Sequence, residues 1–137
     1  MTTDSQRLRM IAVAGPRLDV SRLPQVEGVE VRGFVPDLNR LLAACDLGLV
    51  QGGLSTTMEL AAYRRPFVYF PLRDHCEQQF HVRARLDRYR AGRCLEFDAA
   101  TPEGIAEAML QALRDPPPEP VEAGAAGRVA EMIAELR

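Results

Sequence analysis

The fold is decided by one stretch, LGLVQGGLSTTMELAAYRRPFVYFP, which runs from Leu47 to Pro71. A short apolar run, Leu47–Val50, is interrupted at Gln51–Gly53, and a helical pattern follows from about Thr56 to Tyr63. The next run, Phe67–Phe70, is aromatic and β-branched, and a proline ends it. Two apolar runs separated by a helix-length segment predict a strand–helix–strand unit with parallel strands.

The same alternation extends along most of the chain. The predicted strands are Met10–Ala14, Val29–Phe34, Leu47–Val50, Phe67–Phe70 and Cys94–Phe97. Helices are expected to begin near Pro36, Thr56, Glu77 and Thr101. This order predicts an α/β fold with a Rossmann-like, doubly wound parallel sheet of about five strands. Such sheets bind ligands beyond the carboxyl ends of their strands.

The chain has 137 residues, which is enough for one domain with a core but not for two. We expect residues 1–115 to form the Rossmann-like domain and residues 116–122, which are rich in proline, to form a stiff linker. Residues 123–137 predict an amphipathic helix, with Val129, Met132, Ile133 and Leu136 on its apolar face.

Composition excludes several classes of function. The formal net charge of −2 argues against non-specific binding to nucleic acid or to anionic membranes. No apolar run approaches the ~20 residues that span a bilayer, and the polar start has no segment of signal-peptide type. The three cysteines, Cys45, Cys76 and Cys94, suggest no disulfide framework, so a cytoplasmic setting is expected.

The segment Gln51–Glu59 has the chemistry of an anion site. Glycines at a strand-to-helix turn let the backbone approach a ligand, and the helix start offers free N–H groups and the positive end of its dipole. Ser55 and Thr56 add hydroxyl groups. A structural alternative exists for the last residue, because Thr56 and Glu59 have the spacing of a capping box.

The segment Arg73–Gln79 places many polar side chains at a strand end and a helix start. The structural alternative here is a solvated helix N-terminus with Asp74 as its cap. The set His75, Cys76 and His81 lacks a recognised zinc spacing and a fourth ligand, so no metal site is predicted.

Taken together, these segments resemble the donor site of GT-B glycosyltransferases, among them the bacterial cell-wall N-acetylglucosaminyltransferase family and the UDP-glycosyltransferases. Gly53, Thr56 and Glu59 fall on their shared pattern, roughly small-Gly-x-x-Thr-x-x-Glu. The resemblance implies that Glu59 holds the ribose hydroxyls and that the helix start binds the donor diphosphate. The implied diphosphate residues are Gln51, Gly52, Gly53, Leu54, Ser55 and Thr56. Gln51 departs from the histidine that many UDP-glycosyltransferases carry.

The resemblance also implies contacts to the rest of the donor. Asp74, His75, Gln78 and Gln79 correspond to residues that contact the donor sugar. Phe34 and Val35 match a stretch that lies against the nucleotide base, which is expected to be uracil, although thymine would fit the same contacts. For Phe34, packing of a strand end in the core is an equal alternative.

The implied function is donor binding in a glycosyltransferase that transfers a hexosyl group from a UDP-sugar, with no cofactor or metal. The usual first strand and the acceptor-binding domain are not recognisable, so catalytic residues are unassigned and the chain alone is expected to be inactive. An acceptor-binding partner chain and a homodimer through the last helix are expected partners. The alternatives are half of a sugar-nucleotide epimerase and a non-catalytic scaffold subunit that binds nucleotide sugars.

Overall fold

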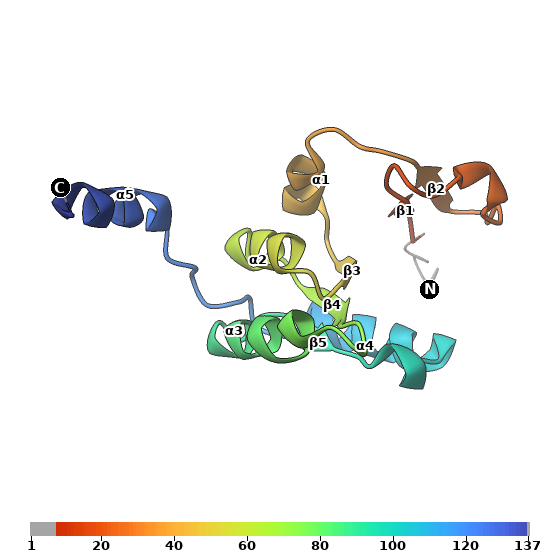
Figure 1. Cartoon of the computed structure of the whole chain (residues 1–137). Helices are drawn as coiled ribbons and strands as arrows, with labels where there is room; N and C mark the ends of the chain where they lie inside the picture. Colours follow the sequence, from red (N-terminus) through yellow and green to blue (C-terminus); the bar gives the residue numbers. More distant parts are fainter. Residues whose placement is uncertain (1–7, 137) are drawn as a thin grey trace. The chain divides into compact units, whose positions relative to one another are not determined.

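The computed structural model describes residues 8–136, and Figure 1 shows the order of the helices and strands. The chain divides into two compact units, Met1–Leu38 and Asn39–Arg137.

The first unit contains a two-stranded parallel sheet. Strand β1, Met10–Val13, pairs with β2, Val29–Arg32, in a register that places Met10 opposite Val29. The connection includes a short 3-10 helix, η1, at Val20–Arg22, and the Asp19 carboxylate caps it by accepting from the Ser21 N–H at 3.0 Å.

The second unit contains a three-stranded parallel sheet in the order β3-β4-β5. Its strands are Gly48–Gln51, Phe67–Phe70 and Arg93–Cys94. The central strand β4 is the core of the unit, since Phe67 and Val68 are fully buried and Tyr69 is nearly so. This burial on both faces is why the run reads as continuously apolar and aromatic rather than as an alternating pattern.

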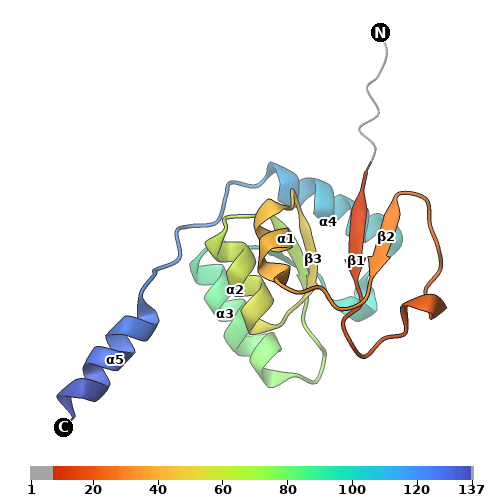
Figure 2. The ribbon, with the colours of Figure 1, turned by 90° about the horizontal axis from the view of Figure 1, so that it is seen from above.

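Helices connect and cover these strands. Their bounds are Leu38–Ala44 for α1, Leu54–Ala62 for α2, Arg83–Arg88 for α3, Pro102–Arg114 for α4 and Ala125–Glu135 for α5. Figure 2 shows α2 and α3 next to each other on one side of the β3-β4-β5 sheet, with α4 on the other. Leu60 of α2 and Leu86 of α3 are fully buried.

The prediction of a parallel α/β fold with five strands is confirmed, but the strands form two sheets rather than one. Among residues 8–136, no ladder joins β1 or β2 to the β3-β4-β5 sheet.

Several element boundaries differ from the sequence-based prediction, and three of them involve α2, η2 and the last strand. Helix α2 begins at Leu54, two residues before the expected start. The expected helix from Glu77 begins instead with six residues of π-helix, η2, at Glu77–Val82, before α3 continues it. The last strand is shortened to Arg93–Cys94, because the chain turns into the 3-10 helix η3, Phe97–Ala99, instead of extending the ladder.

The proline-rich segment packs partly against other parts of the second unit. Pro118 is buried and its carbonyl accepts a hydrogen bond from Arg64 Nε at 3.0 Å. The next residue, Glu119, donates its N–H to the carbonyl of Tyr89 at 2.8 Å. The free length of the predicted linker is therefore shorter than its composition suggests. Helix α5, which follows, is exposed along its length, and no helix among residues 8–136 has the length and apolar character to cross a bilayer.

Candidate functional site

The carboxyl ends of β3 and β4 lie side by side, which brings together the two segments that the sequence singles out. Gln51 is in register with Phe70, and the Gly52 N–H continues the ladder by donating to the Phe70 carbonyl at 2.9 Å. A Cβ atom on Gly52 would lie 2.9 Å from the Cα of Pro71. Only glycine permits this approach without a shift of the backbone, so Gly52 sets the distance between the two loops.

The N-terminus of α2 has no side-chain cap. Gly53 is the N-cap residue, with an extended backbone at φ −71° and ψ 142°, and no side chain accepts from the first turn. The N–H groups of residues 54–56 have no acceptor among residues 8–136. Helix α4 differs, because the Thr101 hydroxyl accepts from the Gly104 N–H at 3.0 Å. The start of α2 is thus open to an external anion in a way that the start of α4 is not.

The hydroxyl that stabilises this helix start belongs to Thr57, which the sequence analysis did not single out. Thr57 is fully buried, and its Oγ1 donates to the carbonyls of Gly53 at 2.7 Å and Leu54 at 3.1 Å. A threonine within a helix commonly donates its hydroxyl to a carbonyl of the preceding turn. The pair Thr56-Thr57 therefore offered two candidates for this bond. Thr56 itself is half-buried and makes no side-chain hydrogen bond within residues 8–136. Ser55 and Gln51 are exposed.

The capping-box interpretation of Glu59 is wrong. Because Gly53 is the N-cap, Glu59 lies well inside the helix and cannot reach back to the cap residue. Its side chain is half-buried, and its carboxylate makes no hydrogen bond or ion pair with any other residue in the described range 8–136. The carboxylate therefore has no structural partner to hold it and is available to a ligand.

After β4 the chain forms a turn, Leu72–His75, that carries the polar residues of the second segment. The turn is closed by a hydrogen bond from the His75 N–H to the Leu72 carbonyl at 3.2 Å. Asp74 is exposed and does not cap the following helix, whose N-cap is Cys76 without a side-chain bond. Asp74 is therefore not the helix cap that was its structural alternative.

The ring of His75 is oriented by its own helix. His75 Nδ1 accepts a hydrogen bond from the Gln78 N–H at 3.4 Å, so the neutral ring carries its proton on Nε2. The side chain is exposed, which leaves the Nε2–H free to donate. Next to it, Arg73 forms an ion pair with Asp98 that connects the turn to η3.

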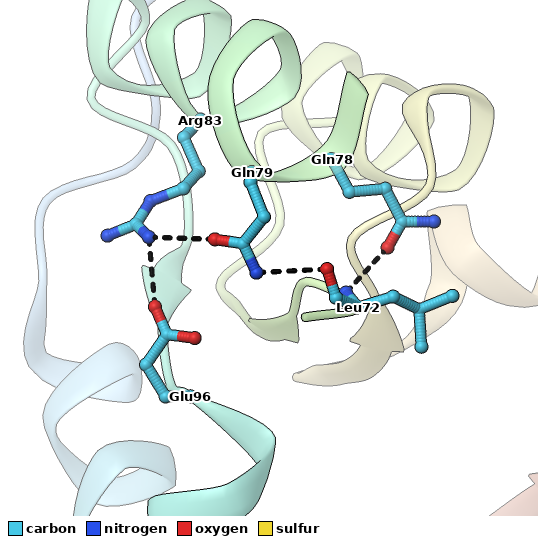
Figure 3. Close-up of polar contacts among 5 residues, drawn as sticks. All are labelled: Leu72, Gln78, Gln79, Arg83 and Glu96. Carbon is cyan, nitrogen blue, oxygen red and sulfur yellow. Dashed lines mark hydrogen bonds and ion pairs between the residues drawn. The ribbon is translucent and has the colours of Figure 1, made fainter. Parts of the chain in front are cut away.

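Unlike the carboxylates of Glu59 and Asp74, the side-chain amides of Gln78 and Gln79 form hydrogen bonds with other residues of the chain (Figure 3). Gln78 is buried, and its Oε1 accepts from the Leu72 N–H at 2.9 Å. Gln79 donates from Nε2 to the Leu72 carbonyl at 2.9 Å and accepts at Oε1 from Arg83 at 3.3 Å. Both amide orientations follow from these partners.

The residues expected at the base belong to the first unit. The Phe34 side chain is 70% exposed, so the alternative of a core position is not observed, and Val35 is half-buried. The same unit has an open cavity of about 520 Å³ between η1 and β2, which neither of these residues lines.

The cysteines form no recognisable reactive centre. All three thiols are free, and only that of Cys76 is exposed. Burial raises the pKa of the Cys94 thiol and of the neighbouring Tyr69 hydroxyl, so both groups are neutral near pH 7. His81 is exposed on η2, and residues 8–136 contain no cluster of three metal-ligating side chains.

These features define the class: an α/β domain with a doubly wound parallel topology, an open helix N-terminus at a strand end and free carboxylates near it. Residues 3–136 match the sequence family described as the glycosyltransferase family 28 C-terminal domain. The chain belongs to this family.

Individual relatives agree with that membership. A UDP-N-acetylglucosamine–N-acetylmuramyl-(pentapeptide) pyrophosphoryl-undecaprenol N-acetylglucosamine transferase from Methylorubrum populi is 34% identical over 107 residues, which cover 77% of this chain and 29% of the relative. The enzyme of the same name from Anaplasma marginale is 26% identical over 87 residues, which cover 63% of this chain and 24% of the relative. The chain thus spans less than a third of the length of these relatives.

A solved structure shows the same fold. The crystal structure of the glycosyltransferase of kitacinnamycin superposes with a TM-score of 0.65 at 21% identity, over 79% of this chain and 27% of that one. The fold is accordingly one half of a GT-B fold, as the sequence predicts.

The contact between Gly52 and Pro71 generates a prediction about stability. Replacing Gly52→Ala forces the two loops apart, and we expect it to lower the free energy of unfolding by ~1–3 kcal/mol. Gly53→Ser is the matched control, because a Cβ atom there meets nothing within 4 Å and serine is a good N-cap. Urea denaturation should place Gly53→Ser within ~0.5 kcal/mol of the wild type. Equal midpoints for the two variants would contradict the account.

Proposed function

We propose that this domain binds the nucleotide-sugar donor of a glycosyltransferase that transfers a hexosyl group from a UDP-sugar. The observation that carries the proposal is the uncapped start of α2 combined with the unpartnered carboxylate of Glu59 on the same helix. The family of the chain and the names of its curated relatives support a UDP-sugar as the donor.

In this proposal the diphosphate lies at the start of α2. The N–H groups of residues 54–56 supply donors, the Ser55 and Thr56 hydroxyls add two more, and the helix dipole favours the negative charge. Gly52 and Gly53 let the backbone approach the phosphate oxygens, and Gln51 donates a neutral hydrogen bond. A diphosphate would thus satisfy the N–H groups that find no acceptor among residues 8–136.

The ribose is assigned to Glu59 and the sugar to the turn after β4. The two oxygens of a carboxylate can accept both hydroxyl protons of a cis-diol. Asp74 is an acceptor and the His75 Nε2–H a donor, which together suit a sugar hydroxyl that both donates and accepts. Phe34 and Val35 are assigned to the base, for which the relatives favour uracil.

Two substitutions test the donor site. Glu59→Ala should weaken UDP binding by ~1–3 kcal/mol and leave stability nearly unchanged, because the carboxylate has no partner among residues 8–136. Gly53→Ser should also weaken UDP binding, since the new hydroxyl competes for the same N–H groups, while stability stays equal or rises. Calorimetric titration of UDP and urea denaturation measure the two effects.

Glu131→Ala, an exposed glutamate of α5, is the control for the loss of one negative charge. If the Glu59→Ala variant binds UDP as tightly as the wild type, the assignment of Glu59 to the ribose is wrong. Loss of stability in Glu59→Ala without loss of binding would favour a purely structural role.

Catalysis is assigned to groups outside this domain. The general base and the acceptor site are proposed to come from an acceptor-binding domain or a partner chain, and no metal or other cofactor is proposed. We therefore expect the chain alone to bind UDP-N-acetylglucosamine weakly and to neither transfer nor hydrolyse it. A coupled assay for released UDP tests this, and robust turnover by the isolated chain would refute it. Epimerised nucleotide sugar among the products would instead identify an epimerase.

The exposed apolar face of α5 is proposed to mediate self-association in the absence of another partner. Val129, Met132 and Ile133 are each more than half exposed on this face. Because Pro118 and Glu119 pack against the domain, the informative truncation removes only the residues after Val121. Light scattering should show an oligomer for the full chain and a monomer for the truncation. A monomer in both cases would contradict the proposal.

The cytoplasm is the proposed location. The three cysteines are free and form no disulfide, which fits a reducing compartment.

A further inference from the structure

The diphosphate site proposed at the start of α2 contains no cation of its own. The segment Gln51–Glu59 has neither lysine nor arginine, so a diphosphate there would meet only neutral N–H and hydroxyl groups and the end of the helix dipole. That end is equivalent to roughly +0.5 elementary charge, whereas a diphosphate carries a negative charge on each phosphate group. A cationic side chain from a neighbouring segment would balance the rest.

The turn after β4 supplies such a side chain. Arg73 belongs to this turn, and the loop after β3 has no basic residue. The two loops meet at Gly52 and Pro71, where a Cβ atom on Gly52 would lie 2.9 Å from the Cα of Pro71. Arg73 lies two residues beyond this contact on one loop, and Leu54, with the first open N–H group, lies two residues beyond it on the other. Because two residues span at most ~7 Å, both positions belong to one small area of the sheet edge.

Arg73 is held by an exposed partner. Its guanidinium forms an ion pair with Asp98 of η3, and the two side chains are 73% and 56% exposed. Ion pairs of such exposure contribute only ~0–1 kcal/mol, because water and salt screen them. Arg73 makes no other hydrogen bond or ion pair with residues 8–136 through its side chain. Exchange of Asp98 for a better acceptor therefore costs little.

A second arginine near this edge, Arg83, is more firmly placed. Its Nη1 donates to Glu96 at 2.9 Å and to Gln79 Oε1 at 3.3 Å, as Figure 3 shows. Arg83 is also less exposed than Arg73, at 39% of its side chain. A diphosphate would have to break two contacts to recruit Arg83 and only one to recruit Arg73.

Carboxylates outnumber guanidinium groups in this part of the second unit. Asp74 and Glu77 follow Arg73 in the chain, and Glu96 and Asp98 follow β5; all four are exposed. While Arg73 is paired with Asp98, these carboxylates repel an approaching diphosphate. Transfer of the guanidinium to the phosphates would place positive charge beside them and leave Asp98 in water, where an exposed carboxylate is well solvated.

We propose that Arg73 is the cation of the donor site, and that it exchanges Asp98 for the diphosphate when a nucleotide sugar binds. A guanidinium forms bidentate, charge-assisted hydrogen bonds with phosphate oxygens, which are stronger than one exposed ion pair. Asp98 is then a competitor that holds Arg73 in the absence of a donor. The inference rests on the proposed function, because it assumes that the diphosphate binds at the start of α2.

The two partners of the ion pair should affect binding in opposite directions. Arg73→Met removes the cation and should weaken UDP binding roughly 10–100-fold, as expected for a hydrogen bond to a charged group. Asp98→Asn removes the competitor and should tighten UDP binding by up to about fivefold. Neither variant should change the affinity for uridine, which has no phosphate. Calorimetry measures UDP binding, and titration followed by nuclear magnetic resonance measures uridine binding.

Matched controls make the same changes of charge elsewhere. Arg85→Met and Asp87→Asn alter two exposed residues of α3, and both variants should bind UDP like the wild type. In the Arg73→Met background, Asp98→Asn should give no gain, because no arginine is left to release. Weaker UDP binding in both single variants would show that the pair only holds the turn and would overturn the proposal. Unchanged UDP affinity in either single variant would overturn it as well.

The role of Arg73 and the proposed function can fail separately. If UDP binds and Glu59→Ala weakens its binding while Arg73→Met does not, only the assignment of Arg73 is wrong. If the wild type binds no UDP, the proposed function fails and the role of Arg73 fails with it.

Discussion

The contact on which the candidate site depends is the backbone approach of Gly52 to Pro71. The Gly52 N–H bonds to the Phe70 carbonyl at 2.9 Å, and the absence of a side chain lets the loop after β3 lie against the end of β4. Helix α2 then starts from one loop, and the Leu72–His75 turn leaves from the other. Without that approach, the open helix N-terminus and the turn with Asp74 would not share one edge of the sheet.

The hydrogen bonds of the second unit divide the residues expected at the donor into two groups. Glu59 and Asp74 each had an ordinary structural role available, as part of a capping box and as a helix cap, and the structure uses neither. Gln78 and Gln79 had no obvious structural role, and the structure gives them one on Leu72. Each amide keeps further capacity, since its nitrogen has two N–H donors and its oxygen two lone pairs, so both glutamines could also hydrogen-bond to a ligand.

Much of this fold could be predicted from the sequence because its signals are local. The buried run Phe67–Phe70 and the glycine break after Val50 predict the strands and the turn between them. The start of α2 is harder to predict from the sequence, because the Thr57 hydroxyl, rather than that of Thr56, stabilises the first turn. The amides that contact Leu72 lie six and seven positions further along the chain, in a π-helical turn. No periodic sequence pattern predicts this geometry. The division into two sheets depends on a strand pairing that local signals do not report.

A crystal structure of the chain with UDP-N-acetylglucosamine would show whether the start of α2 and the turn after β4 form one donor site. Diphosphate oxygens are expected within hydrogen-bond distance of the N–H groups of residues 54–56. The ribose hydroxyls are expected on Glu59 and the sugar beside Asp74 and His75. A nucleotide sugar bound elsewhere, with the start of α2 unoccupied, would contradict this donor site.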